Sequence, residues 1–111
     1  MVNENIINKI NQFRDERNWR KFHNEKDLSL SISIEAAELL ELFQWKESNE
    51  VVKNNKSRIS EELADVFIYS IMLADNMGFD INEIIENKLK VNSEKYPIEK
   101  AYNSSKKYND L

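Results

Sequence analysis

The fold is decided by the stretch Ile34-Glu35-Ala36-Ala37-Glu38-Leu39-Leu40-Glu41-Leu42-Phe43, and the pattern returns in Ser60-Glu61-Glu62-Leu63-Ala64-Asp65-Val66-Phe67-Ile68-Tyr69. Each stretch places two carboxylates three residues apart: Glu35 with Glu38, and Glu62 with Asp65. Residues at this spacing are neighbours on the surface of a helix, with Cβ atoms about 5–6 Å apart. If the two stretches are helices that face each other, four carboxylates therefore surround one hole.

The side chains around these carboxylates predict two helices that are apolar on nearly every side, over residues 28–46 and 58–77. At about 100° per residue, their apolar positions are not confined to one stripe. A helix that is apolar all round is normally buried. The carboxylates on these two helices are therefore not expected to lie on an ordinary solvated face.

Two further helices are predicted, over residues 4–22 and 81–96, with the charged run 14–17 turned away from the apolar face of the first. Four helices with short connections predict an all-α fold, an antiparallel four-helix bundle. We expect one domain over residues 1–97 and a polar tail over 98–111. Because the central helices are apolar on too many sides for a single bundle, we expect the bundle to pair with a second subunit, as a dimer or a tetramer.

Short polar residues and the single glycine mark the predicted helix ends. The predicted N-caps are Asp27 and, in a capping box with Glu83, Asp80; a turn is expected at Asn54-Asn55, and Gly78 is expected just past a helix C-terminus.

Composition limits the possible partners. The chain has 111 residues, no Cys and a net charge of −4, from 16 basic and 20 acidic residues. A nucleic-acid polymer is not expected as a partner, because duplex-binding proteins usually carry a basic face. No run approaches the roughly 20 apolar residues that span a bilayer, so no membrane partner is expected. We expect no signal peptide and a cytoplasmic protein.

The carboxylate pairs favour a metal site over a solvated face. A single helical Glu is most often simply exposed. Four ionised carboxylates in one place would repel each other, and a divalent cation removes that repulsion. Di-iron bundles add a Glu-x-x-His motif on two helices, but Arg20 precedes the only histidine, His23, by three residues. Zinc usually takes Cys or His, so Mg²⁺ is expected, with Mn²⁺ as a possible substitute.

Mg²⁺ commonly joins protein carboxylates to substrate phosphates. Lys88 and Asn92 fall on an inward-facing seam of residues 81–96 and are candidates for phosphate or ribose contacts, although a lysine also extends to the end of a bundle. Tyr69 shares the carboxylate strip and is a candidate for a sugar or phosphate contact, against simple core packing. A base could stack on aromatic rings near the helix ends, which more often belong to the core. These rings are Trp19, Phe22, His23 and Trp45.

At these residues the chain resembles the all-α nucleoside triphosphate pyrophosphohydrolases, the MazG-like superfamily. Five motifs together are similar to its dCTP pyrophosphatase branch. They are Phe13-Arg14-Asp15-Glu16-Arg17-Asn18-Trp19, Phe22-His23, Glu38-Leu39-Leu40-Glu41-Leu42-Phe43-Gln44-Trp45-Lys46, Glu61 to Tyr69, and Lys95-Tyr96-Pro97. The tail residues Ser105-Lys106-Lys107-Tyr108 are similar to that branch as well.

The resemblance implies a role for each candidate residue. Glu35, Glu38, Glu62 and Asp65 would hold Mg²⁺ and carry the catalysis. Trp19, His23 and Trp45 would line the base pocket, and Tyr69, Lys88, Asn92 and Tyr96 would meet sugar and phosphates. The reaction would cleave a triphosphate between its α- and β-phosphates, and sites would be shared between subunits of a tetramer.

The chain departs from the family pattern at two places. Ile34 stands where many members carry a further Glu, which leaves Glu41 or Glu61 as a possible substitute ligand, and Ala36-Ala37 replaces a usual Val-Gly. Three readings stay open beside a dCTP pyrophosphatase. They are a MazG-like hydrolase of other or broader nucleotide preference, a non-catalytic helical binding module, and an oligomer in which the metal serves assembly alone.

Overall fold

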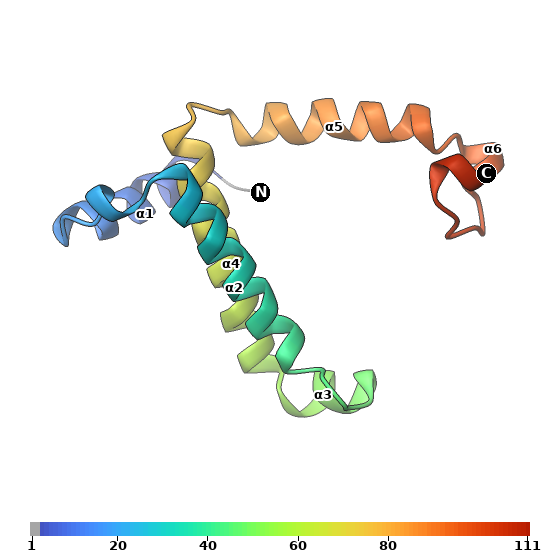
Figure 1. The fold of residues 1–111 in the computed structure, drawn as a ribbon, viewed down its shortest axis with the longest axis horizontal. Coiled ribbons are helices and arrows are strands. Elements are labelled where there is room, and N and C mark those ends of the chain that lie inside the picture. The colour runs from blue at the N-terminus through green and yellow to red at the C-terminus, as the bar shows by residue number, and fades with distance from the viewer. Residues whose placement is uncertain (1–2) are drawn as a thin grey trace. The chain divides into compact units, whose positions relative to one another are not determined.

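The computed structural model describes residues 3–111 and contains only helices and connecting turns over that range (Figure 1). The α-helices are α1 (Glu4–Glu16), α2 (Glu25–Glu41), α3 (Ser48–Asn54), α4 (Lys56–Asn76), α5 (Ile81–Lys95) and α6 (Ile98–Ala101). Single 3₁₀ turns lie at Arg20–Phe22 and Tyr108–Asp110. The predicted all-α class is therefore confirmed.

Contacts divide the chain into two units, the first ending at Gly78 and the second running from Phe79 to Leu111. The domain predicted over 1–97, with a tail over 98–111, stays a prediction, and its first two residues lie outside the described range. No helix in the described part of the chain has the length and apolar character that crossing a membrane requires.

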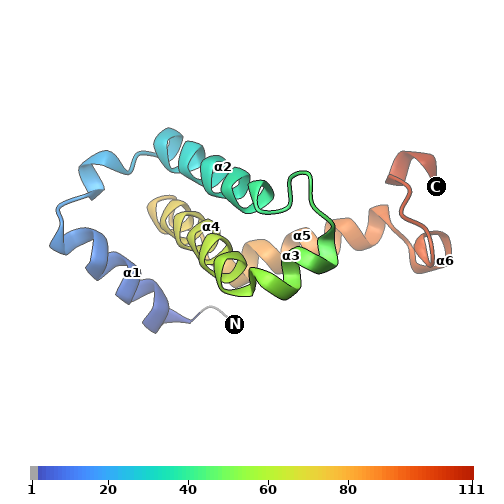
Figure 2. The ribbon, with the colours of Figure 1, turned by 90° about the horizontal axis from the view of Figure 1, so that it is seen from below.

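An antiparallel pair of helices, α2 and α4, forms the centre of the first unit. The two lie side by side in both views, and α3 makes the turn between them (Figures 1 and 2). Leu28 of α2 is buried against the C-terminal half of α4, where Ile71, Met72 and Ala74 are buried too. Helix α1 packs on α4. These contacts hold the two carboxylate-bearing helices next to each other.

The first two helices differ from their predicted bounds because capping was misread. Helix α1 ends at Glu16 rather than at residue 22. Asn18 has a φ of 52°, a left-handed conformation that is incompatible with a right-handed helix. Helix α2 begins at Glu25 because the Asn24 side chain caps it, accepting the Asp27 N–H at 2.8 Å. The predicted cap at Asp27 was wrong, since that residue lies inside the first turn. Trp45 has a φ of 62° and lies past the end of α2, which was predicted to reach residue 46.

The later helix ends follow the predicted capping chemistry. Gly78 has a φ of +69° just after α4, as expected of a residue past a helix C-terminus. The Asp80 carboxylate accepts the Glu83 N–H at 3.0 Å and caps α5. The expected turn at Asn54-Asn55 joins α3 to α4, and α3 itself occupies most of the segment predicted as a connector.

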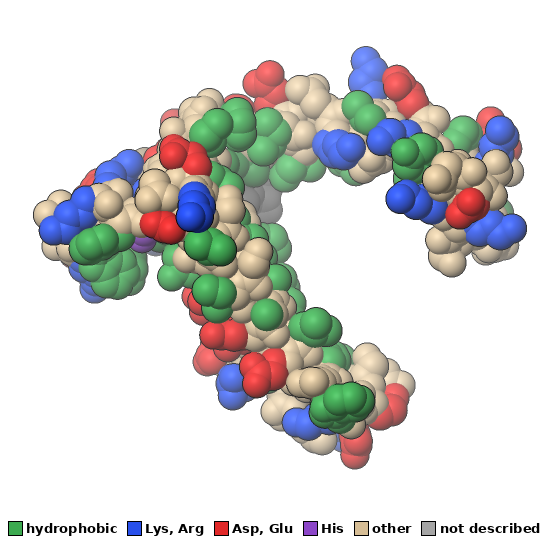
Figure 3. All heavy atoms as spheres, in the orientation of Figure 1, with side chains coloured by type: hydrophobic (Ala, Val, Ile, Leu, Met, Phe, Trp, Pro, Cys, Tyr) green, Lys and Arg blue, Asp and Glu red, His purple; other side chains and the backbone are tan. Residues whose placement is uncertain are grey.

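Burial in the single chain shows two features that bear on the predictions. The α2–α4 pair is not buried all round: Leu30, Ile34, Leu40 and Phe67 are each more than half exposed. Figure 3 shows hydrophobic side chains on the surface of this pair, among acidic ones. Arg14, placed with the solvent-facing charges, is instead completely buried.

The second unit consists of α5, α6 and the C-terminal turn. Helix α5 buries none of its residues fully. The C-terminal segment folds back on its end, where the ring of Tyr108 lies edge-on to that of Tyr96 with centroids 6.1 Å apart. The Lys95 ammonium lies 4.8 Å from the centre of the Tyr108 ring. The tail thus contacts the end of α5 through the ring of Tyr108.

Candidate active site

Three of the four predicted metal ligands converge between α2 and α4. One carboxylate oxygen each from Glu35, Glu62 and Asp65 lie within 4.8 Å of one another, and all three residues are half-buried. Glu35 comes from α2, whereas Glu62 and Asp65 lie one turn apart on α4. The helix spacing brings the α4 pair together, and the antiparallel contact with α2 adds the third group.

Glu38, the fourth predicted ligand, is exposed and is not part of the converging group. It lies one turn after Glu35 on α2, and its carboxyl group is one of the neighbours that raise the pKa of Glu35. Glu41 and Glu61, the possible substitute ligands, are both exposed and do not belong to the converging group. The structure therefore brings together Glu35, Glu62 and Asp65, and the role of Glu38 as a ligand stays a prediction.

The cluster is electrostatically strained without a cation. The pKa of Glu35 is raised to about 7, first by burial and then by the neighbouring Glu38 carboxyl and the negative charges of Asp65 and Glu62. Burial and the charges of Glu35, Asp65 and Glu38 likewise raise the pKa of Tyr69. A bound cation would reverse both effects, because it favours the ionised carboxylate.

Two carboxylate oxygens in the cluster have no hydrogen-bond partner. Both Glu35 Oε2 and Glu62 Oε2 are inaccessible to solvent and unpaired. The other oxygen of Glu62 lies 3.6 Å from the guanidinium of Arg58. A buried carboxylate oxygen without a donor or a cation is costly. The residues therefore fit a hard divalent cation, which oxygen ligands of this kind hold.

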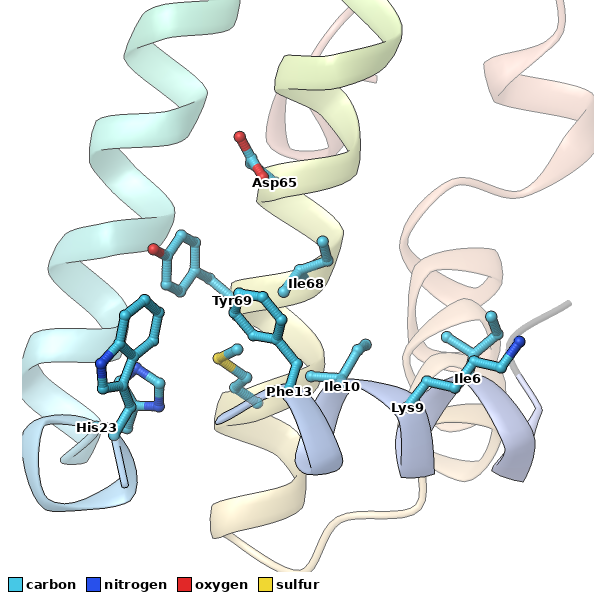
Figure 4. Close-up of a pocket in the computed structure, with 10 residues that line it drawn as sticks. Ile6, Lys9, Ile10, Phe13, His23, Asp65, Ile68 and Tyr69 are labelled. Atoms are coloured by element: carbon cyan, nitrogen blue, oxygen red, sulfur yellow. The ribbon is translucent and has the colours of Figure 1, made fainter. Parts of the chain in front are cut away.

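A cavity of about 450 Å³ adjoins the cluster. Its wall includes Asp65 and Tyr69 from α4, and Figure 4 shows Ile6, Lys9, Ile10 and Phe13 on α1 along one side, with His23 on the other. Trp19, Ile68 and Met72 complete the lining. Cavities of about 300–1,000 Å³ with mainly apolar walls are typical of small-molecule sites. Because Asp65 belongs to both the cavity and the carboxylate cluster, one ligand can reach both.

Aromatic rings form the far end of this cavity. Trp19 meets Phe13 edge to face at 5.6 Å between centroids, and it meets His23 in the same way at 6.3 Å. Burial and the charges of Arg14 and Arg20 lower the pKa of His23, so its imidazole is neutral at neutral pH. Its Nδ1 is buried and unpaired. A planar ligand could stack here and hydrogen-bond to a neutral ring.

The remaining predicted site residues lie outside this cavity. Trp45 is 93% exposed at the turn after α2 and is not part of the lining. Lys88, Asn92 and Tyr96 lie one turn apart along α5 and its C-terminal cap, in the second unit. Their contacts with a nucleotide remain predictions.

The sequence did not single out several residues that build the cavity. Ile6, Ile10 and Phe13 lie on α1 and line the cavity, although none of them was predicted from the sequence to have a role in a site. Arg14 and Asn76, which hydrogen-bond to each other behind it, were not recognised as a pair. For Phe13, the only signal in the sequence was its place six residues before Trp19 in the motif 13–19.

Comparison with known proteins places the chain in a family. A model of the MazG-like family matches residues 30–111, which include both carboxylate motifs. The chain belongs to the MazG-like family. The resemblance noted from the motifs is therefore confirmed, and the acidic cluster is the metal-binding candidate of a MazG-like chain.

Relatives with names are similar over most of this MazG-like chain. The human and mouse proteins called dCTP pyrophosphatase 1 are 36% and 35% identical over 105 residues, or 90% of the chain. The chain spans 62% of the length of these two relatives. A pyrophosphatase from Archaeoglobus fulgidus has a similar crystal structure, with a TM-score of 0.82 and 43% identity over 85% of this chain and 91% of that one.

Proposed function

We propose that this chain is a Mg²⁺-dependent nucleoside triphosphate pyrophosphohydrolase whose preferred substrate is dCTP or a modified dCTP. One observation carries the proposal: the α2–α4 carboxylate cluster, with its two unpaired buried oxygens, opens into a cavity with aromatic walls. Family membership and the names of the relatives support the same reaction and base.

The carboxylates account for the triphosphate end of the substrate. Glu35, Glu62 and Asp65 would hold Mg²⁺, with Glu38 as the fourth ligand or as the acceptor of a hydrogen bond from water, since it is the exposed member. When bound, Mg²⁺ neutralises phosphate charge and polarises the phosphorus under attack. In the reaction, a water molecule would lose a proton to solvent or to a carboxylate of the cluster as its oxygen bonds to the α-phosphorus, and the bond from that phosphorus to the oxygen bridging the α- and β-phosphates would break. The products are a nucleoside monophosphate and pyrophosphate.

The cavity accounts for the nucleoside end. Trp19 and His23 would offer a ring face and a neutral imidazole to the base. Tyr69, which also lines the cavity, would meet the sugar or the α-phosphate. Lys88, Asn92 and Tyr96 would supply further sugar and phosphate contacts from α5. Trp45, exposed in the single chain, would reach a base only if subunits assemble.

Pairing of subunits is the second part of the proposal. A second copy would cover the exposed apolar side chains of the α2–α4 pair, which include Leu40 at 70% and Phe67 at 56% exposure. Apolar surfaces of this kind commonly mark protein interfaces. The assembly would be a dimer or a tetramer, with sites completed between subunits.

A triphosphate panel tests the function. Purified protein with Mg²⁺ should release pyrophosphate and a monophosphate, fastest from dCTP or a C5-modified dCTP, and activity should disappear with a chelator and return with Mg²⁺ or Mn²⁺. Equal rates on all bases would instead indicate a broad MazG-like hydrolase. Release of single phosphates would contradict the cleavage position. If no triphosphate is hydrolysed but chelation dissociates the oligomer, the metal serves assembly.

A further inference from the structure

Arg14 is completely buried, yet it has no ion pair among the described residues. Removing a guanidinium from water is costly, and a protein with a hydrophobic residue of similar size in its place is often at least as stable. Its Nε also lacks a hydrogen-bond partner. Stability alone therefore does not explain why a charged group lies here, beside the aromatic end of the cavity.

The side-chain amide of Asn76 connects the Arg14 guanidinium to the backbone of His23. Its Nη2 donates to the Asn76 side-chain oxygen at 2.9 Å, and the Asn76 side-chain nitrogen donates to the backbone carbonyl of His23 at 2.6 Å. Asn76 is the last residue of α4, so the rigid centre of the unit holds the residue just before the cap of α2. An asparagine suits this relay because its amide accepts on one side and donates on the other.

The Arg14 backbone holds the other aromatic wall. Its carbonyl oxygen accepts the Trp19 N–H at 2.9 Å, across a turn in which Asn18 has a φ of 52°. Residues 17–23 between α1 and α2 are thus fixed at Trp19 through the Arg14 backbone and at His23 through its guanidinium. Both side chains line the cavity.

We propose that Arg14 and Asn76 are positioning residues that hold Trp19 and His23 at the separation a planar base requires, and so set the base selectivity of the site. This inference rests on the proposed function. Neither residue lines the cavity itself. They act through the segment 17–23, which has no other described side-chain hydrogen bond from α4 to its backbone.

Asn76→Asp separates positioning from stability. The aspartate keeps an acceptor for Arg14 and adds an opposite charge, so the fold should be retained, but it has no N–H for the His23 carbonyl. Loss of one such hydrogen bond should raise KM for the preferred triphosphate about tenfold. The kcat at saturation should change less than about twofold. The ratio of kcat/KM between the preferred triphosphate and those with other bases should fall by about tenfold, as KM rises.

Ser70→Ala is the matched control on the same helix. It removes a part-buried side-chain hydrogen bond, from Ser70 Oγ to the Val66 carbonyl at 2.7 Å, that does not involve residues 17–23. Its KM and base preference should equal those of the wild type. A purely structural role for Asn76 would lower the melting temperature or the active fraction and leave KM and base preference unchanged. That result would overturn the proposal.

Fluorescence tests the positioning without any substrate. The chain has two tryptophans, so Trp45→Phe leaves Trp19 as the only indole. Adding Asn76→Asp to Trp45→Phe should shift Trp19 emission to the red and increase its quenching by acrylamide, because Asn76 no longer holds His23, whose ring lies edge-on to that of Trp19. If the wild type hydrolyses no triphosphate, the proposed function fails and this signal alone decides. Unchanged emission and quenching would then overturn the positioning role.

Discussion

Glu35 links the site to pH. Its pKa is about 7 in the folded, metal-free chain and about 4.5 when unperturbed. Because the pKa is raised, the folded state favours the neutral acid. The contribution of protonated Glu35 to the free energy of unfolding is therefore fully present below about pH 4.5 and is lost as the pH rises through about 7. Glu35→Gln is always neutral. With a chelator present, the melting temperature of Glu35→Gln should equal that of the wild type below about pH 4.5 and should be higher than that of the wild type above about pH 7.

Mg²⁺ should reduce that difference in melting temperature. The ion requires the ionised carboxylate, so wild-type affinity should increase as the pH rises through about 7, with a proton released on binding. Above that pH the wild type should gain about 2.7 kcal/mol at an Mg²⁺ concentration of 100 Kd, and Glu35→Gln much less. Differential scanning calorimetry in paired buffers measures both effects. A pH-independent difference between the two chains in chelator would contradict the raised pKa.

Glu61 and Glu62 are neighbours with different surroundings, which gives a matched pair of variants. Glu62 is half-buried with one unpaired oxygen in the cluster, whereas Glu61 is exposed. Glu62→Gln should weaken Mg²⁺ binding by at least about tenfold and reduce turnover with it, because it removes a charged ligand. Glu61→Gln should leave both unchanged. Isothermal titration with Mg²⁺ and a pyrophosphate-release assay check this; equal losses would mean that the ligand is misassigned.

The site residues that the sequence could predict are those whose partners are close along the chain. The three-residue spacing of Glu62 and Asp65 fixes their proximity once the segment is helical, and the repeat on the other helix suggests where the remaining ligands lie. Arg14 and Asn76 are 62 residues apart, and nothing in either local pattern links them. A buried arginine in a charged run looks like a solvated one until the tertiary contact is known.

Helix interiors were predicted better than helix ends, because periodicity extends over many residues while a cap depends on one side chain. Both Asn24 and Asp27 are good capping residues, and the sequence alone does not say which of them closes α2. The structure assigns the role to Asn24, whose oxygen accepts the Asp27 N–H while its nitrogen donates to the Asp27 carboxylate at 2.8 Å. The three-residue shift at the start of α2 follows from that choice.

Asn24→Ala should therefore destabilise the chain by about 1 kcal/mol, the usual cost of losing an N-cap. Asn24→Ser keeps an acceptor for the Asp27 N–H and should lose less than half as much. Urea unfolding followed by circular dichroism gives both free energies. If Asp27→Ala proved more costly than Asn24→Ala, the cap would lie where the sequence first suggested.

For the whole molecule, apolar patterning predicted the helical class, and the two carboxylate pairs suggested that their helices face each other. It also predicted that these helices are too apolar for one chain, and the exposed side chains of the α2–α4 pair agree with that expectation. The pattern does not say which surface meets a partner. Periodicity indicates which residues are buried, but it does not distinguish burial within one chain from burial between two chains.

The proposed pairing predicts which charges break the assembly. Leu40→Arg on α2 or Phe67→Arg on α4 would place a guanidinium in the apolar interface and should raise the dissociation constant about 100-fold, equivalent to about 2.8 kcal/mol. Val52→Arg on α3 introduces the same charge at a residue of similar exposure, 49%, away from the α2–α4 pair, and should leave the assembly intact. Sedimentation velocity over a concentration series distinguishes them. Dissociation by Val52→Arg alone would move the interface to α3, and a monomeric wild type would leave Trp45 without a partner surface.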